Sequence, residues 1–197
     1  IRTVRKFHIF TDLDGTLLGK EDYRYEVNMQ LISDLKGKGI GISLNTSKTL
    51  SETECWQYKL GLDSPFIVEN GAAILFPKNK FELEQLKPHK VESRAGYFCI
   101  VLGMKIDRLE VLYRPYAERV TSLIHCPKKE AMGLTGLGGT DLQRALTREF
   151  TLPLIVPDPS IKQELASVAS QIGARLIEGG RFCHLQGNSD KGSSMLI

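Results

Sequence analysis

The chain has 197 residues, of which 42% are hydrophobic and 25% are charged, and its formal net charge is +3. This composition is typical of globular proteins, and the charge is too small to indicate a nucleic-acid partner. No apolar segment reaches the roughly 20 residues needed to span a bilayer, and the first six residues lack the apolar core of an export signal. We therefore expect a cytoplasmic protein that binds neither nucleic acid nor a membrane, with its four scattered cysteines reduced.

The first 78 residues alternate between predicted strands and helices. Apolar runs predict buried strands at 7–10, 40–44, 65–68 and 72–76. Apolar residues at helical spacing predict a helix with a core-facing side formed by Val27, Leu31, Ile32 and Leu35. A second helix is expected to begin at Ser51, because Ser51 and Glu54 have the spacing of a capping box. The pair Asn70-Gly71 predicts a tight turn between the last two strands. This order indicates an α/β fold with a doubly wound core sheet.

Beyond residue 78 the pattern continues with shorter elements. Strands are expected at 97–102, 153–156, 174–177 and 181–185. Helices are expected at 107–113, after Pro127, from Thr140 with Gln143 as its capping partner, and from Ser160 with Gln163 to Gly173. We interpret residues 1–78 as the first part of the core, 79–183 as an inserted α/β cap, and 184–197 as the return to the core.

Two aspartates follow the first predicted strand. If residues 7–12 are extended, Asp12 and Asp14 lie two positions apart, so both carboxylates can leave the carboxyl end of the strand on one side. Ligands of open α/β sheets bind in the crevice outside these strand ends. A like-charged pair at such a place is costly unless a cation neutralises it or its pKa values are driven apart. The pair is therefore a candidate catalytic and metal-binding centre.

The stretch Thr-Asp-Leu-Asp-Gly-Thr-Leu-Leu at 11–18 resembles the first motif of the haloacid dehalogenase superfamily of phosphotransferases. The resemblance implies a Rossmann-like core in which Asp12 is the nucleophile that becomes an aspartyl phosphate. It implies that Asp14 is the acid/base residue. It also implies that Mg²⁺ bridges the Asp12 carboxylate, the Asp14 carbonyl and the phosphate, which suits the preference of this ion for oxygen ligands.

Two further segments match the order of motifs in this superfamily. The segment at 43–49 follows the second strand, and the resemblance assigns Thr46, or alternatively Ser47, to hold a phosphate oxygen. The segment at 187–192 contains Asp190-Lys191-Gly192 before small and apolar residues. The resemblance assigns Lys191 to the charge of the nucleophile and the phosphate, although a single lysine is usually a solvated surface residue.

Phrases within the predicted cap, at 68–72, 135–137, 148–153 and 180–184, are similar to those of mannosyl-3-phosphoglycerate phosphatases, a Cof-like branch of the superfamily. This similarity implies hydrolysis of mannosyl-3-phosphoglycerate to mannosylglycerate, and thus a small phosphorylated sugar as the partner. An arginine could grip an anion bidentately while acidic and amide side chains bind hydroxyls, but each of these residues could equally serve a cap or a surface ion pair. The candidate substrate-binding residues are Ser47, Glu69, Asn70, Gly71, Arg148, Glu149, Arg181 and His184.

One departure from the superfamily pattern leaves alternatives open. The fourth motif, an acidic Gly-Asp cluster that completes the metal site, has no counterpart in the six residues after Lys191. We therefore expect an incomplete core at the carboxyl end, either because the chain is a fragment or because it is short in nature. The alternatives are a phosphatase for another sugar phosphate, a phosphomannomutase, or a relative that binds a sugar phosphate or a protein without catalysis. The sequence makes no prediction about the oligomeric state.

Overall fold

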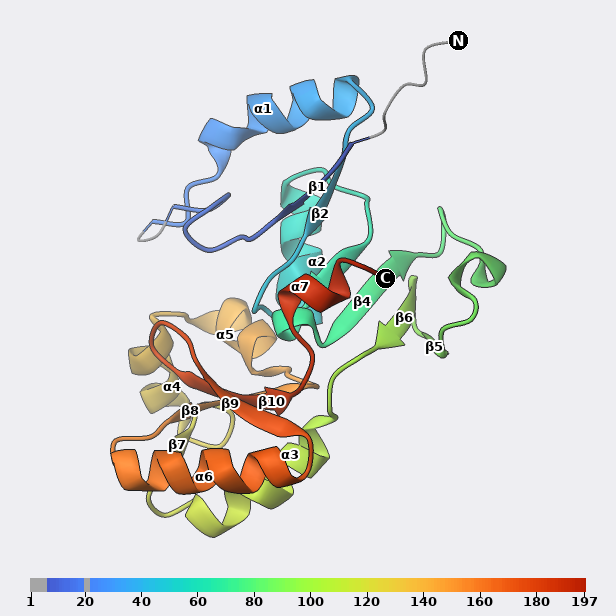
Figure 1. Ribbon diagram of the computed structural model, residues 1–197. Coiled ribbons are helices and arrows are strands. Elements are labelled where there is room, and N and C mark those ends of the chain that lie inside the picture. Colours follow the sequence, from blue (N-terminus) through green and yellow to red (C-terminus); the bar gives the residue numbers. More distant parts are fainter. Residues whose placement is uncertain (1–6, 20–21) are drawn as a thin grey trace.

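The computed structural model describes residues 7–19 and 22–197, and the start of the chain on which the expectation about export rests lies outside these residues. The molecule has two parts, a core that carries the first strands and a second α/β layer beneath it (Figure 1). Within the described residues, no helix combines the length and the apolar character that a membrane span requires. The predicted α/β class is confirmed.

The core is built on one run of neighbouring strands. The first two, β1 (His8–Thr11) and β2 (Gly41–Leu44), are parallel, and a single parallel bridge from Asn45 to Ile67 joins them to β3 (Phe66–Val68). From there the order is β3, β4 (Ala73–Pro77), β6 (Tyr97–Val101) and β5 (Val91–Ser93), with antiparallel pairing throughout. The turn predicted at Asn70-Gly71 is the short 3₁₀ helix η1 (Glu69–Gly71), which reverses the chain between β3 and β4. A second 3₁₀ helix, η2 (Leu83–Leu86), precedes β5.

Two helices complete the first part of the core, α1 (Glu26–Gly37) and α2 (Leu50–Lys59). The predicted core-facing side of α1 is partly wrong, because Ile32 is buried whereas Val27 and Leu31 are 78% and 54% exposed. The residues of α1 that pack on the core are Met29, Ile32 and Leu35, which lie three apart along one stripe of the helix. The capping box of α2 consists of Thr49 and Glu52, two residues before the predicted pair.

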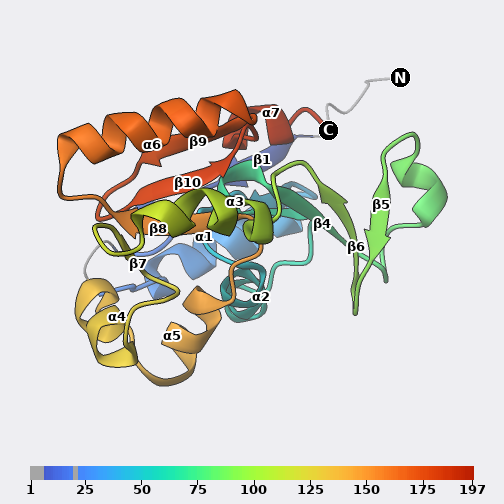
Figure 2. The same ribbon diagram turned by 90° about the horizontal axis from the view of Figure 1, so that it is seen from below.

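The second layer is a four-stranded antiparallel sheet in the order β7 (Thr121–Ser122), β8 (Thr151–Ile155), β10 (Cys183–Gly187) and β9 (Ala174–Glu178). Two helices, α3 (Ile106–Tyr113) and α6 (Pro159–Gln171), cover one face of this sheet (Figure 2). The short η3 (Arg114–Tyr116) follows α3, and α4 (Lys128–Thr135) and α5 (Gly139–Leu146) lie at the side of the sheet, with α5 in contact with α2. Two predicted caps are wrong, because α5 starts after Gly138 and α6 starts after Asp158, whose carboxylate accepts from the Ser160 N–H.

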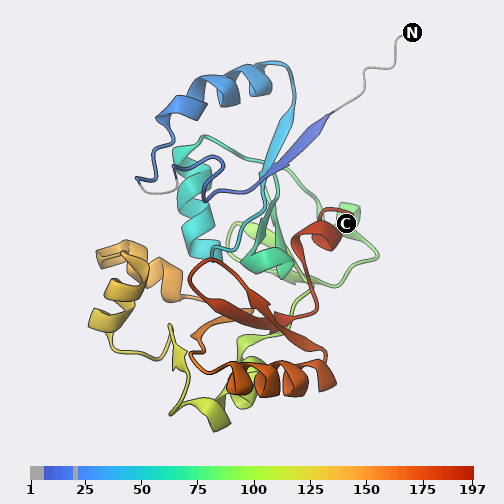
Figure 3. The ribbon, with the colours of Figure 1, turned by 60° about the vertical axis from the view of Figure 1, so that its left-hand side comes forward.

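Side chains of the second sheet alternate between its two faces. Leu152, Leu154, Leu176 and Leu185 pack with α3 and α6 in a separate hydrophobic cluster. The residues that alternate with these leucines along the strands therefore point towards the core. Figure 3 shows the second sheet lying below the core strands. The face that carries Arg175 and His184 is thus the one that meets the core.

The chain passes from the core to the second layer at Gly103 and returns after Gly187. The two passages touch, because a Cβ atom added at Gly187 would lie 2.6 Å from the Met104 nitrogen. After the second passage, α7 (Lys191–Ser194) packs beside η1 of the core. The predicted division at residues 78 and 183 remains a prediction. Because β5 and β6 pair with β4, whereas β10 pairs with β8 and β9, we propose 104–187 as the extent of the cap.

Candidate active site

The end of β1 presents two carboxylates that hold different lysines. Asp12 follows β1 directly, and its Oδ1 accepts the N–H of Leu13 at 2.8 Å. Its Oδ2 lies 2.7 Å from Nζ of Lys191. Asp14 lies two residues further on, and its Oδ1 is 3.0 Å from Nζ of Lys48. Both carboxylates are partly exposed, at 41% and 44%, so they remain open to a ligand.

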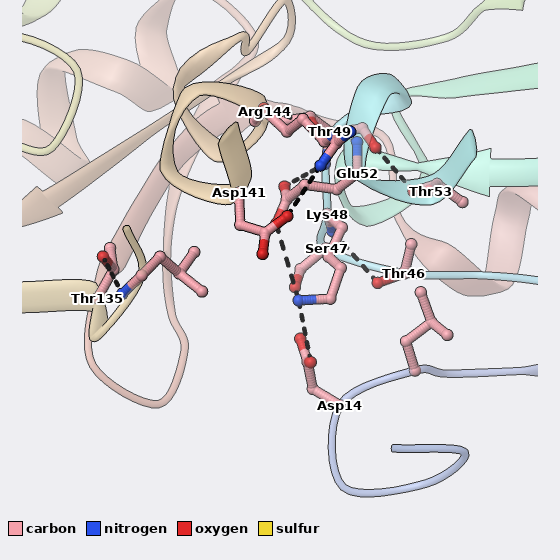
Figure 4. A network of polar contacts seen from close by, with 12 residues as sticks. Asp14, Thr46, Ser47, Lys48, Thr49, Glu52, Thr53, Thr135, Asp141 and Arg144 are labelled. Atoms are coloured by element: carbon pink, nitrogen blue, oxygen red, sulfur yellow. Dashed lines mark hydrogen bonds and ion pairs between the residues drawn. The ribbon is translucent and has the colours of Figure 1, made fainter. Parts of the chain in front are cut away.

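The lysine beside Asp14 is itself buried. Lys48 is 8% exposed and lies within 3.8 Å of the Glu52 carboxylate, which belongs to the first turn of α2 (Figure 4). Burial by itself lowers the pKa of Lys48, but the carboxylates of Glu52 and Asp14 outweigh this effect, and the pKa is raised above its ordinary value. Lys48 is therefore a fixed positive charge at the site. We did not predict it from the sequence, although a lysine directly before the N-cap of a helix that follows the second strand is a usable signal.

The second segment predicted to be catalytic lies at the end of β2. Thr46 is fully buried, and its hydroxyl accepts the N–H of Lys48 at 3.2 Å. Ser47 is half-buried and lines two pockets. Ser47 thus lies in the pocket wall, whereas the Thr46 hydroxyl is buried and bonded to the backbone of Lys48. The choice between the two hydroxyls stays a prediction.

Lys191 is the first residue of α7, and two core contacts fix it. The Asn45 amide donates to the Lys191 carbonyl at 2.9 Å. Gly71, with a φ of +89°, lies so close to α7 that an added Cβ atom would be 2.1 Å from the Asp190 carbonyl oxygen. Only glycine fits such an approach and such a φ. The role of Gly71 in the structure is therefore to let α7 carry Lys191 to Asp12.

Glu69 and Asn70, both predicted to bind substrate, join the core to the cap. The buried Glu69 carboxylate accepts hydrogen bonds from the N–H groups of Glu149 and Phe150 and from the Thr151 hydroxyl, at 2.9, 3.1 and 2.7 Å. The Asn70 amide donates to the Gln186 side chain of β10 at 3.0 Å. Both carboxylate oxygens of Glu69 are therefore taken up by hydrogen bonds to residues at the start of β8.

The cap contributes Arg148 and His184 to the site. Arg148 donates to the Ser47 carbonyl at 3.2 Å and to the Thr151 hydroxyl at 2.7 Å. Burial, followed by the nearby Arg148 guanidinium, lowers the pKa of His184 to about 4, so the ring is neutral at pH 7. Together with Asp14, Ser47 and Lys48, these residues line a pocket of about 550 Å³ between core and cap. This volume lies within the range of about 300–1,000 Å³ that is usual for small-molecule sites.

The other predicted residues lie at its rim or away from it. Arg181 lines the same pocket, and its guanidinium reaches the carbonyl oxygens of Leu134 and Thr135 at 3.3 and 3.4 Å. Glu149 forms an ion pair with Arg94 at 2.6 Å and is not a lining residue of this pocket. Three predicted substrate-binding residues therefore line neither of the two pockets that Ser47 lines, namely Glu69, Gly71 and Glu149.

The donors at the end of β1 fit a small, hard cation. Carboxylate and carbonyl oxygens are the ligands that Mg²⁺ prefers. Within residues 7–19 and 22–197, no group of three or more His, Cys, Asp or Glu side chains is placed to hold a metal. Among the described residues, Asp12 and Asp14 are the ones that would hold Mg²⁺, an ion that commonly retains several waters.

Comparisons with known proteins agree with this geometry. Residues 9–98 match the family model of the haloacid dehalogenase-like hydrolases. The fold resembles solved structures, including one from Thermoplasma acidophilum (TM-score 0.65, 14% identity, 97% of this chain and 69% of that one). Another is the Synechocystis sucrose-phosphatase in complex with sucrose and phosphate (TM-score 0.58, 14% identity, 98% and 69%).

Curated relatives share more of the sequence. A glucosyl-3-phosphoglycerate/mannosyl-3-phosphoglycerate phosphatase of Persephonella marina is 36% identical over 96% of this chain and 70% of its own. A mannosyl-3-phosphoglycerate phosphatase of Pyrococcus horikoshii is 30% identical over 96% of this chain and 75% of its own. These relatives define the protein as a phosphatase, and the chain belongs to the haloacid dehalogenase-like hydrolases. Within this family it is similar to the mannosyl-3-phosphoglycerate phosphatases, the branch that the cap phrases indicated.

Proposed function

We propose that the protein hydrolyses a glycosyl-3-phosphoglycerate, with mannosyl-3-phosphoglycerate as the first candidate, through an aspartyl phosphate on Asp12 and with Mg²⁺ as cofactor. One observation carries the proposal. Two carboxylates at the end of β1 are each held by a separate lysine, beside pockets that the core and the cap form together. The activities after which the relatives are named support the choice of substrate.

In the first step, an oxygen of Asp12 attacks the phosphorus in line with the departing oxygen. The bond from phosphorus to the glycerate oxygen breaks, and Asp14 gives its proton to that oxygen. In the second step, Asp14 takes a proton from a water molecule as the water oxygen attacks the phosphorus. The bond between Asp12 and phosphorus breaks, and inorganic phosphate leaves.

Other residues stabilise the charge that moves during these steps. Lys191 offers a positive charge to Asp12 and to the transferred phosphoryl group, and Thr46 or Ser47 donates a hydrogen bond to a phosphate oxygen. Mg²⁺, held by Asp12 and Asp14, would neutralise the phosphate charge. The cap, through Arg148, Arg181 and His184, binds the rest of the substrate and excludes water from the pocket.

The change Asp12→Asn tests this mechanism. We expect release of inorganic phosphate from mannosyl-3-phosphoglycerate to stop, because a neutral amide neither attacks phosphorus nor forms the acyl phosphate. Asp107→Asn on the exposed side of α3 is the control and should keep full activity. Retention of full activity by the Asp12 variant would reject the mechanism.

A panel of substrates distinguishes the proposed function from its alternatives. A phosphatase for another sugar phosphate would release phosphate from sucrose phosphate or a hexose phosphate in preference to the glycosyl-3-phosphoglycerate. A phosphomannomutase would interconvert mannose phosphates with little release of phosphate. A non-catalytic relative would bind Mg²⁺ or a sugar phosphate in calorimetry without releasing phosphate from any of them.

A further inference from the structure

A second pocket, of about 360 Å³, lies on the other side of Ser47 and His184 from the larger one. Its walls come from the core-facing side of β9 and β10 and from the segment that leads into α7, and include Arg175, Gln186, Asn70 and Lys191. Lys191 holds Asp12. The pocket is therefore adjacent to the proposed nucleophile, and none of the motifs used so far explains Arg175.

Arg175 has a buried donor without an acceptor. Its Nη2 donates to the Ser189 carbonyl at 2.6 Å, which fixes the plane of the guanidinium, whereas its Nε is buried and has no hydrogen-bond partner. Nδ1 of His184, which lines the same pocket, is also buried and has no hydrogen-bond partner. Buried polar atoms are nearly always paired in native proteins, so two unpaired atoms beside one pocket indicate an absent ligand, and the N–H of Arg175 Nε requires an acceptor on that ligand.

Two cations and two carboxylates line the pocket, and of the cations Lys191 is held by Asp12, whereas the Asp190 carboxylate lies beyond hydrogen-bond distance of Arg175. Of its acidic residues, Glu178 is paired with Lys162. Asp190 accepts the Ser193 N–H at 2.8 Å as the N-cap of α7, and its carboxylate is 4.0 Å from Nη2 of Arg175. The amides of Asn70 and Gln186 are neutral and bonded to each other. Arg175 thus meets the pocket with a planar donor group suited to a carboxylate.

We propose that this pocket is the subsite for the carboxylate of the substrate and that Arg175 is its specificity-determining residue. The inference rests on the proposed function, since a glycosyl-3-phosphoglycerate carries a carboxylate in addition to its phosphate. With the phosphate at Asp12 and Lys191, the glycerate carboxylate reaches Arg175 and the sugar occupies the larger pocket across Ser47. A neutral sugar phosphate would leave the Nε of Arg175 unpaired and would bind more weakly.

The test compares mannosyl-3-phosphoglycerate with its methyl ester, in which the carboxylate charge is removed. Charge-assisted hydrogen bonds contribute enough that Arg175→Met should raise KM for the acid by about 10- to 100-fold. It should leave KM for the ester and kcat for both within about threefold, and Arg175→Lys should restore part of the loss. Arg108→Met, on the exposed side of α3, is the control. Equal effects on acid and ester, or no effect on either, would overturn the subsite.

A binding experiment separates this subsite from the proposed function. Calorimetry with the Asp12→Asn variant measures the binding of 3-phosphoglycerate and of glycerol 3-phosphate, two compounds that differ in the carboxylate. We expect tighter binding of 3-phosphoglycerate by at least about tenfold, and loss of this difference when Arg175→Met is added. If the wild type releases no phosphate from any glycosyl-3-phosphoglycerate while this difference in binding persists, the proposed function fails and the subsite stands. If the two compounds bind equally, the subsite fails whatever the enzyme hydrolyses.

Discussion

At the scale of residues, the site depends on two ion pairs, in which each of the two carboxylates contacts its own lysine. The order of the motifs predicted Lys191. The fold brings this lysine beside Asp12, although the two residues lie near opposite ends of the chain. Lys48 was not predicted, although it lies beside the predicted Thr46 and Ser47, because a lysine in a turn is usually solvated. The structure buries Lys48 between Asp14 and Glu52, and this burial distinguishes it from an ordinary surface lysine.

The change Lys48→Met should lower kcat by about 10- to 100-fold. This factor is part of the rate enhancement that a well-positioned general acid, here Asp14, contributes. The reason is that Asp14 loses the partner that fixes its orientation. Steady-state kinetics with p-nitrophenyl phosphate measure the effect. Lys59→Met is a suitable control, because Lys59 lies at the other end of α2, over the ring of Trp56. An unchanged kcat in the Lys48 variant would show that Asp14 is oriented by other contacts.

His184 should make stability depend on pH. Its pKa is about 4 in the folded protein and 6.5 ordinarily, so between these pH values the unfolded chain takes up a proton that the folded chain does not. The free energy of unfolding therefore falls as the pH drops from 6.5 towards 4, by about 3 kcal/mol at most.

Urea unfolding at pH 7 and at pH 4.5 measures this contribution of His184. The variant His184→Gln should lose less stability over this interval than the wild type. His89→Gln, at an exposed position, should behave as the wild type does. Equal slopes for the wild type and the His184 variant would mean that the ring is protonated in the folded protein.

At the scale of elements, the strands of the first 78 residues were predicted well and the helix starts less well. Short apolar runs bounded by turns give a clear signal, so β2, β3 and β4 lie within about one residue of expectation. Helix starts are ambiguous where hydroxyl and acidic residues repeat, as in the run from Thr49 to Glu54, where two capping boxes fit the sequence. Tertiary contact decides between them, because the Thr49 hydroxyl also donates to the Arg144 carbonyl of α5 at 2.8 Å.

This choice of cap is testable with a pair of variants. Thr49→Val keeps the shape of the side chain but removes the acceptor for the Glu52 N–H and the bond to Arg144. We expect a loss of about 1–2 kcal/mol in the free energy of unfolding. Ser51→Ala should change it by less than about 0.5 kcal/mol. Urea unfolding followed by circular dichroism measures both, and the opposite ranking would restore the cap at Ser51.

At the scale of the whole molecule, the joint between core and cap is the part that sequence reasoning did not reach. Glu69 looked like a substrate residue because it lies in a phrase shared with a family of phosphatases. The hydrogen-bond partners of Glu69 lie 80 to 82 residues away in the chain, and no local sequence pattern predicts such a contact. The order of the sheet shows the same difficulty, since two strands beyond residue 78, β6 and β5, extend the sheet from β4.

The change Glu69→Gln should weaken this joint strongly. An amide group would turn a donor towards one of the three donors that the carboxylate now accepts, and we expect a loss of at least about 2 kcal/mol in the free energy of unfolding. Fluorescence of Trp56, the single tryptophan of the chain and part of the core, follows one part of the molecule while circular dichroism follows both. Glu118→Gln, on the surface of the cap, is the control. Wild-type stability in the Glu69 variant would show that the joint is held by other contacts.

The contact between Gly103 and Gly187 has a consequence for the evolution of the family. A segment whose two ends meet at one point can be removed or exchanged as a cassette, because a few residues suffice to close the gap. The aspartates proposed to be catalytic and their lysines all lie outside this segment, whereas Arg148, Arg175 and His184 lie inside it. Exchange of the cassette would therefore change which substrates bind and leave the residues that transfer the phosphoryl group unchanged.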